Sequence, residues 1–230
     1  MAHLPALISA LSRIWLLDEA AAGVIGRKLR EGGVISAAGR GSSAAVMTAR
    51  DAAALLIGLA SGVSPGRAPE LVRQYLAMIR VGADHSDPDR SLLPRDVTAA
   101  PTFGQALEAL VAFAGELYER FEVRAEAAFG PERWQALGER APLAGSRDSP
   151  IVLEVELEFP SSARITLRPT SGLLWSCDYL VDISAAFPDG ARPASDIGLG
   201  MAPSLRRGAS FDFRPVLAAH FAVVGGDADV

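Results

Sequence analysis

Hydrophobic side chains in the first eighty residues recur every three or four positions. In residues 4–15 this spacing places Leu, Ile and Trp side chains on one face of a helix. The same pattern indicates further helices in residues 19–31, 49–60 and 69–81. We therefore predict that a first domain, residues 1–82, consists of helices whose apolar faces are turned toward one another.

Polar and small residues mark the ends of these predicted helices. Asp18 is a good N-cap for the second helix, and Thr48 begins a variant of the capping box at the start of the third. Gly32-Gly33 would end the second helix, because glycine readily adopts the left-handed conformation of a C-cap. Gly23 and Gly26 weaken the second segment, so one helix and two short helices with a turn near Gly23 both fit the sequence.

Residues 83–102 are rich in Asp and Pro and show no periodicity, so we predict a linker or a long surface loop. After them, six apolar residues alternate at spacings of four and three for about two and a half heptads. They are Phe103, Leu107, Leu110, Ala114, Leu117 and Phe121. Such a seam fits a helix packed inside the chain, and it also fits a helix through which a homo-oligomer forms. A further helix is expected over residues 130–137.

From residue 150 the hydrophobic period changes to two, which is typical of β-strands. In residues 151–158 aliphatic side chains alternate with three glutamates, and in residues 164–168 they alternate with Arg164, Thr166 and Arg168. A hairpin of the two segments would set Glu opposite Arg on a solvated face, which is a structural pairing and not a catalytic one.

The remaining segments complete the predicted fold. A third strand is expected within residues 173–183, and a closing strand with a short helix within 211–224. We predict the α+β class, with an N-terminal all-α bundle followed by a helical and antiparallel-β part. This second part, residues 103–230, would have its helices in 103–140 and its strands from 150.

Charge is distributed unevenly along the chain, whose net charge is −5. Residues 1–50 carry six basic and three acidic side chains, whereas residues 51–150 carry ten and fourteen and residues 151–230 carry six and ten. All of the positive excess therefore lies in the first fifty residues. Such a segment in an otherwise acidic chain indicates a local anion-binding surface more than a wholly basic nucleic-acid binder.

The sequence offers no catalytic signature. The three histidines are far apart in the sequence, and the Gly-Arg-Gly-Ser-Ser loop lacks the lysine of a phosphate-binding loop. The single cysteine, Cys177, cannot form an internal disulfide and lies in an apolar strand context, which fits a buried thiol in a reducing cytoplasm. No signal peptide or membrane-spanning segment is recognisable. We expect a cytoplasmic, non-enzymatic protein without metal or cofactor.

The basic excess is concentrated between residues 27 and 50. The candidate DNA-binding residues are Arg27, Lys28, Arg30, Arg40, Ser42, Ser43 and Arg50. Cations near the end of the second helix are favourable through the helix dipole alone, so they do not require a ligand. An arginine in the first turn of the third helix opposes that dipole, which favours an external anion such as a phosphate.

The run from Leu29 to Ala53 resembles uncharacterised prophage proteins of GC-rich alphaproteobacteria. The matching residues are Leu29-Arg30-Glu31-Gly32-Gly33-Val34-Ile35, Gly39-Arg40-Gly41 and Thr48-Ala49-Arg50-Asp51-Ala52-Ala53. The resemblance covers about residues 1–80 and implies a helix-turn-helix-like module and a DNA-related role. Gly23 and Gly26 stand where such a module has better helix formers, which favours contact with phosphates over reading of bases.

Two functions follow as hypotheses. The first is a DNA-binding protein of phage or prophage type, either a transcriptional regulator or a DNA-packaging recognition subunit, with double-stranded DNA as its partner. The second is a structural or protein-interaction protein in which the basic patch is incidental. In either case a homo-oligomer could form through the helix from Phe103 to Phe121.

Overall fold

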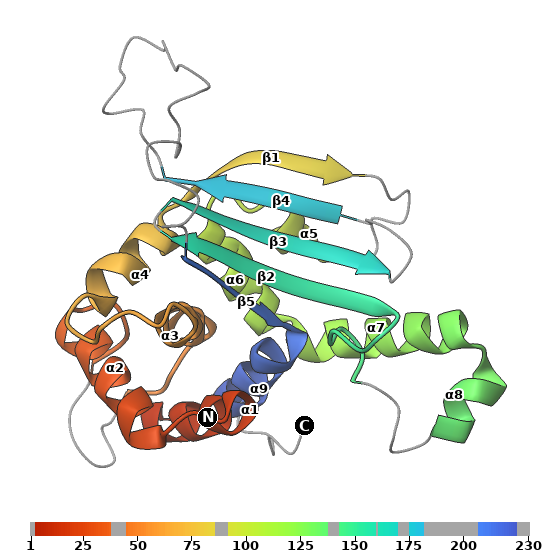
Figure 1. The fold of residues 1–230 in the computed structure, drawn as a ribbon, viewed down its shortest axis with the longest axis horizontal. Coiled ribbons are helices and arrows are strands. Elements are labelled where there is room, and N and C mark those ends of the chain that lie inside the picture. Colours follow the sequence, from red (N-terminus) through yellow and green to blue (C-terminus); the bar gives the residue numbers. More distant parts are fainter. Residues whose placement is uncertain are drawn as a thin grey trace, which may run out of the picture.

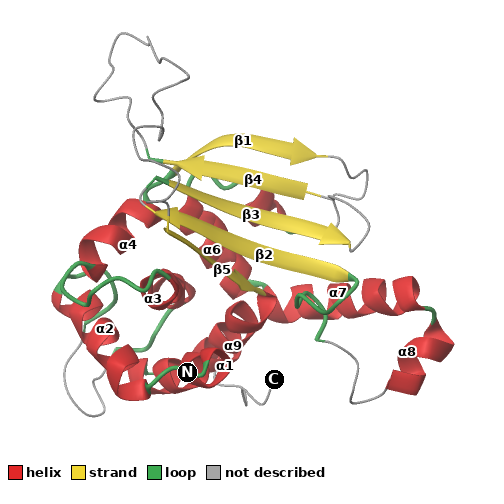
Figure 2. Ribbon diagram, in the orientation of Figure 1, coloured by secondary structure: helices red, strands yellow, loops and turns green. Residues whose placement is uncertain are grey.

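An antiparallel sheet stands against a layer of helices (Figures 1 and 2). The computed structural model describes residues 3–37, 45–85, 92–137, 143–159, 161–169, 175–181 and 207–224. One face of the sheet lies over helices (Figure 2), and along β2 and β3 the side chains of the other face are mostly Glu, Arg and Thr. The predicted α+β class is confirmed.

The first three predicted helices are present at the expected places. The N-terminal helices are α1 Leu4–Trp15, α2 Glu19–Glu31, α3 Ala49–Ala60 and α4 Ala68–Leu76. Asp18 accepts backbone N–H groups at the start of α2, and Thr48 and Asp51 form a complete capping box on α3. α2 is a single helix through both of its glycines. At Gly26 a Cβ would lie 3.0 Å from Cδ1 of Ile8, so glycine here allows α1 and α2 to pack closely.

The fourth predicted helix was too long. α4 ends at Leu76, and β1 Ile79–His85 follows where the prediction continued the helix to Val81. β1 pairs antiparallel with β4, about a hundred residues later in the sequence, so a partner distant in sequence converts this segment into a strand. The predicted domain boundary after residue 82 therefore falls inside a strand.

The described residues of the predicted linker, 83–102, form secondary structure and contribute side chains to the core. It contains the end of β1 and the short helix α5 Arg95–Thr98, and Leu92, Leu93 and Val97 are buried. Helices on either side of the interval also touch, because α3 packs on α6 and α1 packs on α9. The hydrophobic core is continuous from Leu4 to Ala222.

The predicted helix over residues 103–121 is divided into two. α6 Phe103–Ala112 and α7 Ala114–Phe129 meet at Phe113, and α8 Pro131–Leu137 follows. All six residues of the heptad-like seam are buried within the chain. Of the two interpretations of the seam, burial supports packing inside the chain.

The sheet follows the predicted hairpin pattern. Its further strands are β2 Ile151–Phe159, β3 Ser162–Pro169, β4 Trp175–Leu180 and β5 Arg207–Asp212, in the spatial order β1-β4-β3-β2-β5. In the hairpin, Val155 lies opposite Ile165 and both side chains are buried. The closing helix, α9 Phe213–Val224, packs against α1, α3 and α7.

The most enclosed of the N-terminal helices is α3. Every residue from Asp51 to Leu59 is buried, and α3 contacts α2, α4, α6 and α9. Its first turn is the part that reaches the surface: Arg50 is exposed. The core thus fixes the position of α2, which carries Arg27, Lys28 and Arg30, and of the beginning of α3, which carries Arg50.

Candidate nucleic-acid interface

The second half of α2 presents its cations to solvent because its apolar residues face the core. Leu29 is fully buried and Gly26 packs on α1, whereas Arg27 and Arg30 are exposed. Lys28 lies at the margin, where its Nζ is 2.6 Å from Oε2 of Glu31. That ion pair lowers the pKa of the Glu31 carboxyl.

The end of α2 is fixed against α4. A Cβ on Gly32 would lie 2.6 Å from Cβ of Pro69, and Gly33 has a φ of +67°, so both positions favour glycine. The guanidinium of Arg73 donates to the carbonyl oxygen of Gly32. Arg67, in the residue before α4, is also exposed. Arg73 and the beginning of α4, where Arg67 is the N-cap, therefore lie beside the basic end of α2.

The sequence analysis did not identify Arg67 and Arg73 as site residues. Both belong to residues 51–150, where acidic side chains outnumber basic ones. The charge total of that segment therefore gave no reason to consider them as site residues. Only the packing of α4 against the end of α2 brings them next to the predicted patch.

The first turn of α3 is already occupied by a carboxylate. Asp51 is 4% exposed and accepts hydrogen bonds from the backbone N–H of Ser36 at 2.7 Å and of Thr48 at 2.8 Å. The hydroxyl of Thr48 accepts from the N–H of Asp51 at 3.2 Å. Asp51 therefore places a negative charge at this helix end, and contact of Arg50 with an external anion stays a prediction.

For three of the predicted site residues the structure shows whether the side chain already has a partner. Within the described ranges, the guanidinium groups of Arg27, Arg30 and Arg50 make no hydrogen bond or ion pair. The bond between Ser36 and Asp51 holds the segment after α2 against the beginning of α3, so these cations belong to one packed unit. Arg40, Ser42 and Ser43 lie outside the described residues.

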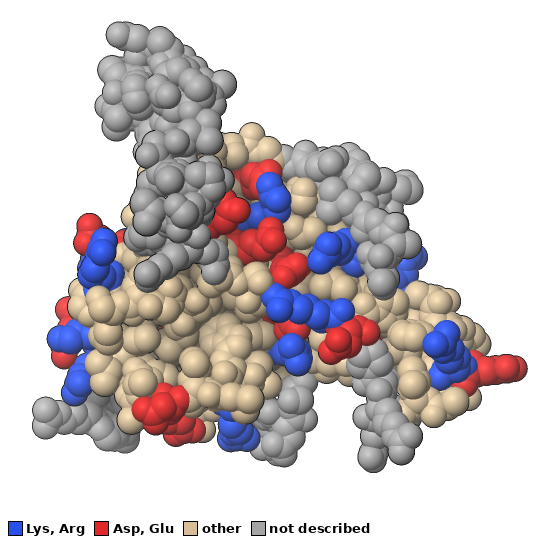
Figure 3. Space-filling view, viewed as in Figure 1, with Lys and Arg blue, Asp and Glu red and all other residues tan. Residues whose placement is uncertain are grey.

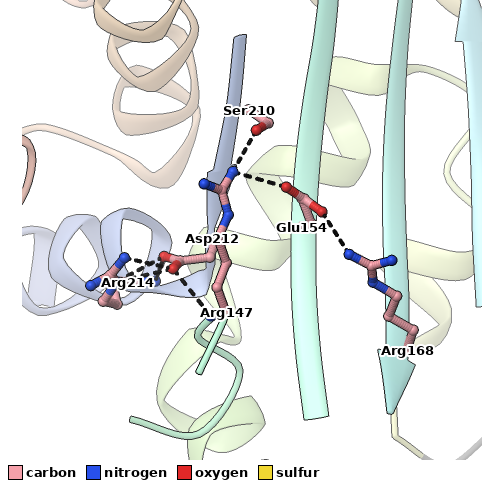
Figure 4. Close-up of polar contacts among 6 residues, drawn as sticks. All are labelled: Arg147, Glu154, Arg168, Ser210, Asp212 and Arg214. Atoms are coloured by element: carbon pink, nitrogen blue, oxygen red, sulfur yellow. Dashed lines mark hydrogen bonds and ion pairs between the residues drawn. The ribbon is translucent and has the colours of Figure 1, made fainter. Parts of the chain in front are cut away.

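Several arginines on and beside the sheet differ from those of α2 because carboxylates hold them. Figure 4 shows Glu154 between two guanidinium groups, with its Oε1 2.9 Å from Nη2 of Arg147 and its Oε2 3.3 Å from Nη2 of Arg168. Arg214 pairs with the buried Asp212, its Nη2 lying 2.9 Å from Oδ2, and this pairing raises the pKa of Arg214.

A further pair joins β3 to β4. Nε of Arg164 lies 2.5 Å from Oδ1 of Asp178, which raises the pKa of the guanidinium. Figure 3 shows the result, with basic and acidic side chains interspersed over the sheet. These contacts agree with the structural role that the sequence predicted for the Glu and Arg rows.

The polar face of the sheet contains a hollow of about 280 Å³. It is lined by Val81, Glu156, Glu158, Ser162, Ala163, Arg164, Asp178 and Leu180. Among the described residues, no group of three or more His, Cys, Asp or Glu side chains is placed to hold a metal ion. Burial raises the pKa of the Cys177 thiol, which makes it a poor nucleophile. The charged side chains around the hollow therefore fit a surface that is held together by salt bridges.

The described helices are too short or too polar to cross a bilayer. The DNA-binding role, the resemblance to prophage proteins and the seven site residues remain predictions at this point. Comparison of the chain with protein-family models, with curated proteins and with solved structures gives no match.

Proposed function

We propose that this protein is a non-enzymatic, cytoplasmic DNA-binding protein that contacts the phosphate backbone of double-stranded DNA through α2 and the beginning of α3. The observation that supports this proposal is that Arg27, Arg30 and Arg50 are exposed and unpaired within the described ranges, while carboxylates hold Arg147, Arg164 and Arg214. Unpaired guanidinium groups on a rigid unit can contact phosphates without first breaking an internal ion pair.

The exposed residues of α2 favour phosphate contact over base reading. Recognition helices read bases mainly through their N-terminal residues, but here Asp18 and Glu19 are exposed at that end. Both would be repelled by phosphates. The cations lie in the second half of the helix, so we expect binding that depends weakly on DNA sequence and strongly on salt.

Within this proposal the protein acts as a phage or prophage regulator or as a recognition subunit for DNA packaging. Arg40, Ser42 and Ser43, which lie outside the described residues, remain proposed DNA contacts, and Lys28 would bind phosphate in competition with its pair to Glu31. Arg67 is an additional candidate because it is exposed beside the end of α2.

The proposal is tested by measuring the affinity of the full chain for a duplex at several salt concentrations. Each phosphate contact contributes about 0.9 to the slope of log K against log salt, so five contacts give a slope of about −4.5. Replacing Arg27, Arg30 and Arg50 together by Ala should reduce its magnitude by about 2.7. Arg164→Ala is the matched control, since that arginine is exposed but paired. Absence of binding at low salt would overturn the proposal.

The second candidate function is binding to another protein. The observation that favours it is that α7 and α8 extend past the end of the sheet (Figure 1), with Val123 70% exposed. If charge reversal at Arg27 and Arg30 changes nothing while a change on α7 alters assembly, protein interaction is the better description.

A further inference from the structure

The connection between α3 and α4 ends in a tight turn on the surface of the protein. The backbone N–H of Arg67 donates to the carbonyl oxygen of Ser64 at 2.9 Å, which closes a β-turn from one residue to the other, the α3–α4 turn. Pro65 at its second position restricts the backbone, because the proline ring fixes φ. The turn is anchored at both ends, since Val63 packs against the core and Ala68 is fully buried. The α3–α4 turn is therefore held in one position.

The turn carries one cation and little side-chain bulk. Ser64, Gly66 and Arg67 are exposed, and a Cβ on Gly66 would meet nothing within 4 Å. Within the described residues, no hydrogen bond or ion pair holds the guanidinium of Arg67. The next acidic residue along the chain, Glu70, is exposed and forms no ion pair with it among those residues. Arg67 therefore offers all of its guanidinium N–H donors to a ligand.

The α3–α4 turn lies next to the basic end of α2. Pro69 packs so closely on Gly32 that a Cβ on this glycine would lie 2.6 Å from Cβ of Pro69. Arg67 precedes Pro69 by two residues, so the Cα atoms of these two residues are at most about 8 Å apart. Figure 1 shows the beginning of α4 beside the end of α2. A duplex that contacts the cations of α2 is therefore within reach of the turn.

The dimensions of DNA separate the role of the turn from that of α2. An α-helix with its side chains is about 10–12 Å across, whereas the minor groove of B-DNA is only about 6 Å wide. Arg27 and Arg30 on the side of α2 can therefore reach phosphates but cannot enter this groove. A single guanidinium beside a glycine is small enough to enter it. Tracts of A·T pairs have the narrowest minor groove and the most negative potential, which attracts arginine, whereas guanine places its N2 amino group in the groove.

We infer that the α3–α4 turn enters the minor groove of A·T-rich duplex DNA, with the guanidinium of Arg67 between the two backbones, while α2 and Arg50 contact phosphates beside the groove. The inference rests on the proposed DNA-binding role and adds the kind of DNA that the protein prefers. The preference follows from the shape and potential of the groove, so it agrees with a weak dependence on base sequence. The alternative, in which Arg67 is one more phosphate contact, gives no preference between A·T-rich and G·C-rich DNA.

The first test compares the affinity of the full chain for two short duplexes of equal length, one with a central tract of A·T pairs and one with G·C pairs throughout. The parent chain should bind the A·T duplex several-fold more tightly, and Arg67→Ala should remove the difference. Arg30→Ala is the matched control, because this exposed arginine of α2 should weaken binding to both duplexes by the same factor. Equal affinity of the parent for the two duplexes, or an equal loss for both in Arg67→Ala, overturns the inference and leaves the DNA-binding role intact. A parent chain that binds neither duplex at low salt overturns both.

Inosine in place of guanine tests which groove is contacted. This exchange removes the N2 amino group from the minor groove and leaves the major-groove edge of the base pair unchanged. The parent chain should bind the inosine·cytosine duplex more tightly than the G·C duplex, and Arg67→Ala should not distinguish them. A preference for A·T pairs that inosine does not reproduce would place the contact in the major groove and contradict the inference.

Gly66→Leu tests the entry of the turn itself without a change of charge. The variant should fold, because a Cβ at Gly66 meets no atom within 4 Å and the backbone there is not left-handed; thermal unfolding checks this. The added bulk should abolish the preference for the A·T duplex and leave the dependence of the affinity on salt nearly unchanged. Ala128→Leu is the control, since it adds a leucine at an exposed position of α7. A folded Gly66→Leu that keeps the full preference would show that the turn stays outside the groove.

Discussion

The backbone N–H of Ser36 donates a 2.7 Å hydrogen bond to Oδ1 of Asp51, fifteen residues later in the sequence. The other oxygen of the same carboxylate accepts from the N–H and the hydroxyl of Thr48, at 2.8 and 2.9 Å. One buried side chain thus closes the capping box of α3 and also ties the segment after α2 to it. This carboxylate therefore helps to hold Arg50 in a fixed position relative to the cations of α2.

Asp51→Ala should lower the free energy of unfolding by about 2 kcal/mol, because it removes a cap and leaves the part-buried N–H groups of Ser36 and Thr48 without their acceptor. Urea unfolding measures the change. Asp18→Ala, which removes an exposed N-cap on α2, should cost only about 1 kcal/mol. Equal losses in the two variants would show that the bond to Ser36 contributes nothing.

All three tyrosines of the chain should resist ionisation. Burial raises the pKa of Tyr75 and Tyr179, and burial together with the hydrogen bond to Glu122 raises the pKa of Tyr118 to about 12. In the unfolded chain these phenols lose their protons near pH 10. Above that pH the folded chain holds more protons than the unfolded chain, so the free energy of unfolding should fall as pH rises.

The measurement is a titration of tyrosinate by ultraviolet absorbance. The native chain should show little tyrosinate at pH 10–11, whereas the chain in urea should show ordinary titration of all three residues. Tyr118→Phe should reduce the loss of stability in this interval, since it removes the phenol and its link to Glu122. Native tyrosines that titrate normally near pH 10 would contradict the burial described above.

Two glycines inside helices should respond in opposite ways to alanine. A Cβ at Gly23 would meet nothing within 4 Å, so Gly23→Ala should stabilise α2 by about 0.5–1 kcal/mol through helix propensity. A Cβ at Gly104 would lie 2.7 Å from the carbonyl oxygen of Leu76, so Gly104→Ala should destabilise the chain by about 1–3 kcal/mol. Thermal unfolding of the pair gives the comparison, and a gain in stability at Gly104 would contradict the close approach of α4 to α6.

Leu16 occupies an unfavourable conformation at the end of α1. Its φ is +52°, in the left-handed region, and its side chain is 92% exposed, so burial does not compensate the strain. Leu16→Gly should raise the free energy of unfolding by about 0.5–1 kcal/mol. Leu17→Gly is the control and should give no gain, since Leu17 has no positive φ. A loss of stability in Leu16→Gly would show that the leucine contributes a contact.

DNA binding should depend unequally on neighbouring cations of α2. Arg30→Ala should reduce the magnitude of the salt slope by about 0.9, as expected for one phosphate contact. Lys28→Ala should reduce it less, because Lys28 Nζ lies 2.6 Å from Glu31 and its charge is partly neutralised. Glu31→Gln should in turn strengthen binding by releasing Lys28. An effect of Lys28→Ala as large as that of Arg30→Ala would argue against this ranking.

Local sequence determined the helices and strands whose signals lie within a few residues. Apolar spacing and the caps at Asp18 and Thr48 define α1, α2 and α3, since a helix satisfies its backbone within the segment itself. The alternation of Ile151 to Leu157 likewise predicts β2 and its hairpin partner, because the turn that joins them is short.

Only the tertiary structure determined the strand and the ion pairs whose partners are distant in the sequence. β1 was predicted as the end of a helix because its partner, β4, comes nearly a hundred residues later, and no local pattern records that pairing. Sequence also named Arg27, Arg30 and Arg50, but it could not show that they are unpaired while Arg147, Arg168 and Arg214 are held by carboxylates. An ion pair depends on distance in space, and only the packed core sets those distances for residues far apart in the chain.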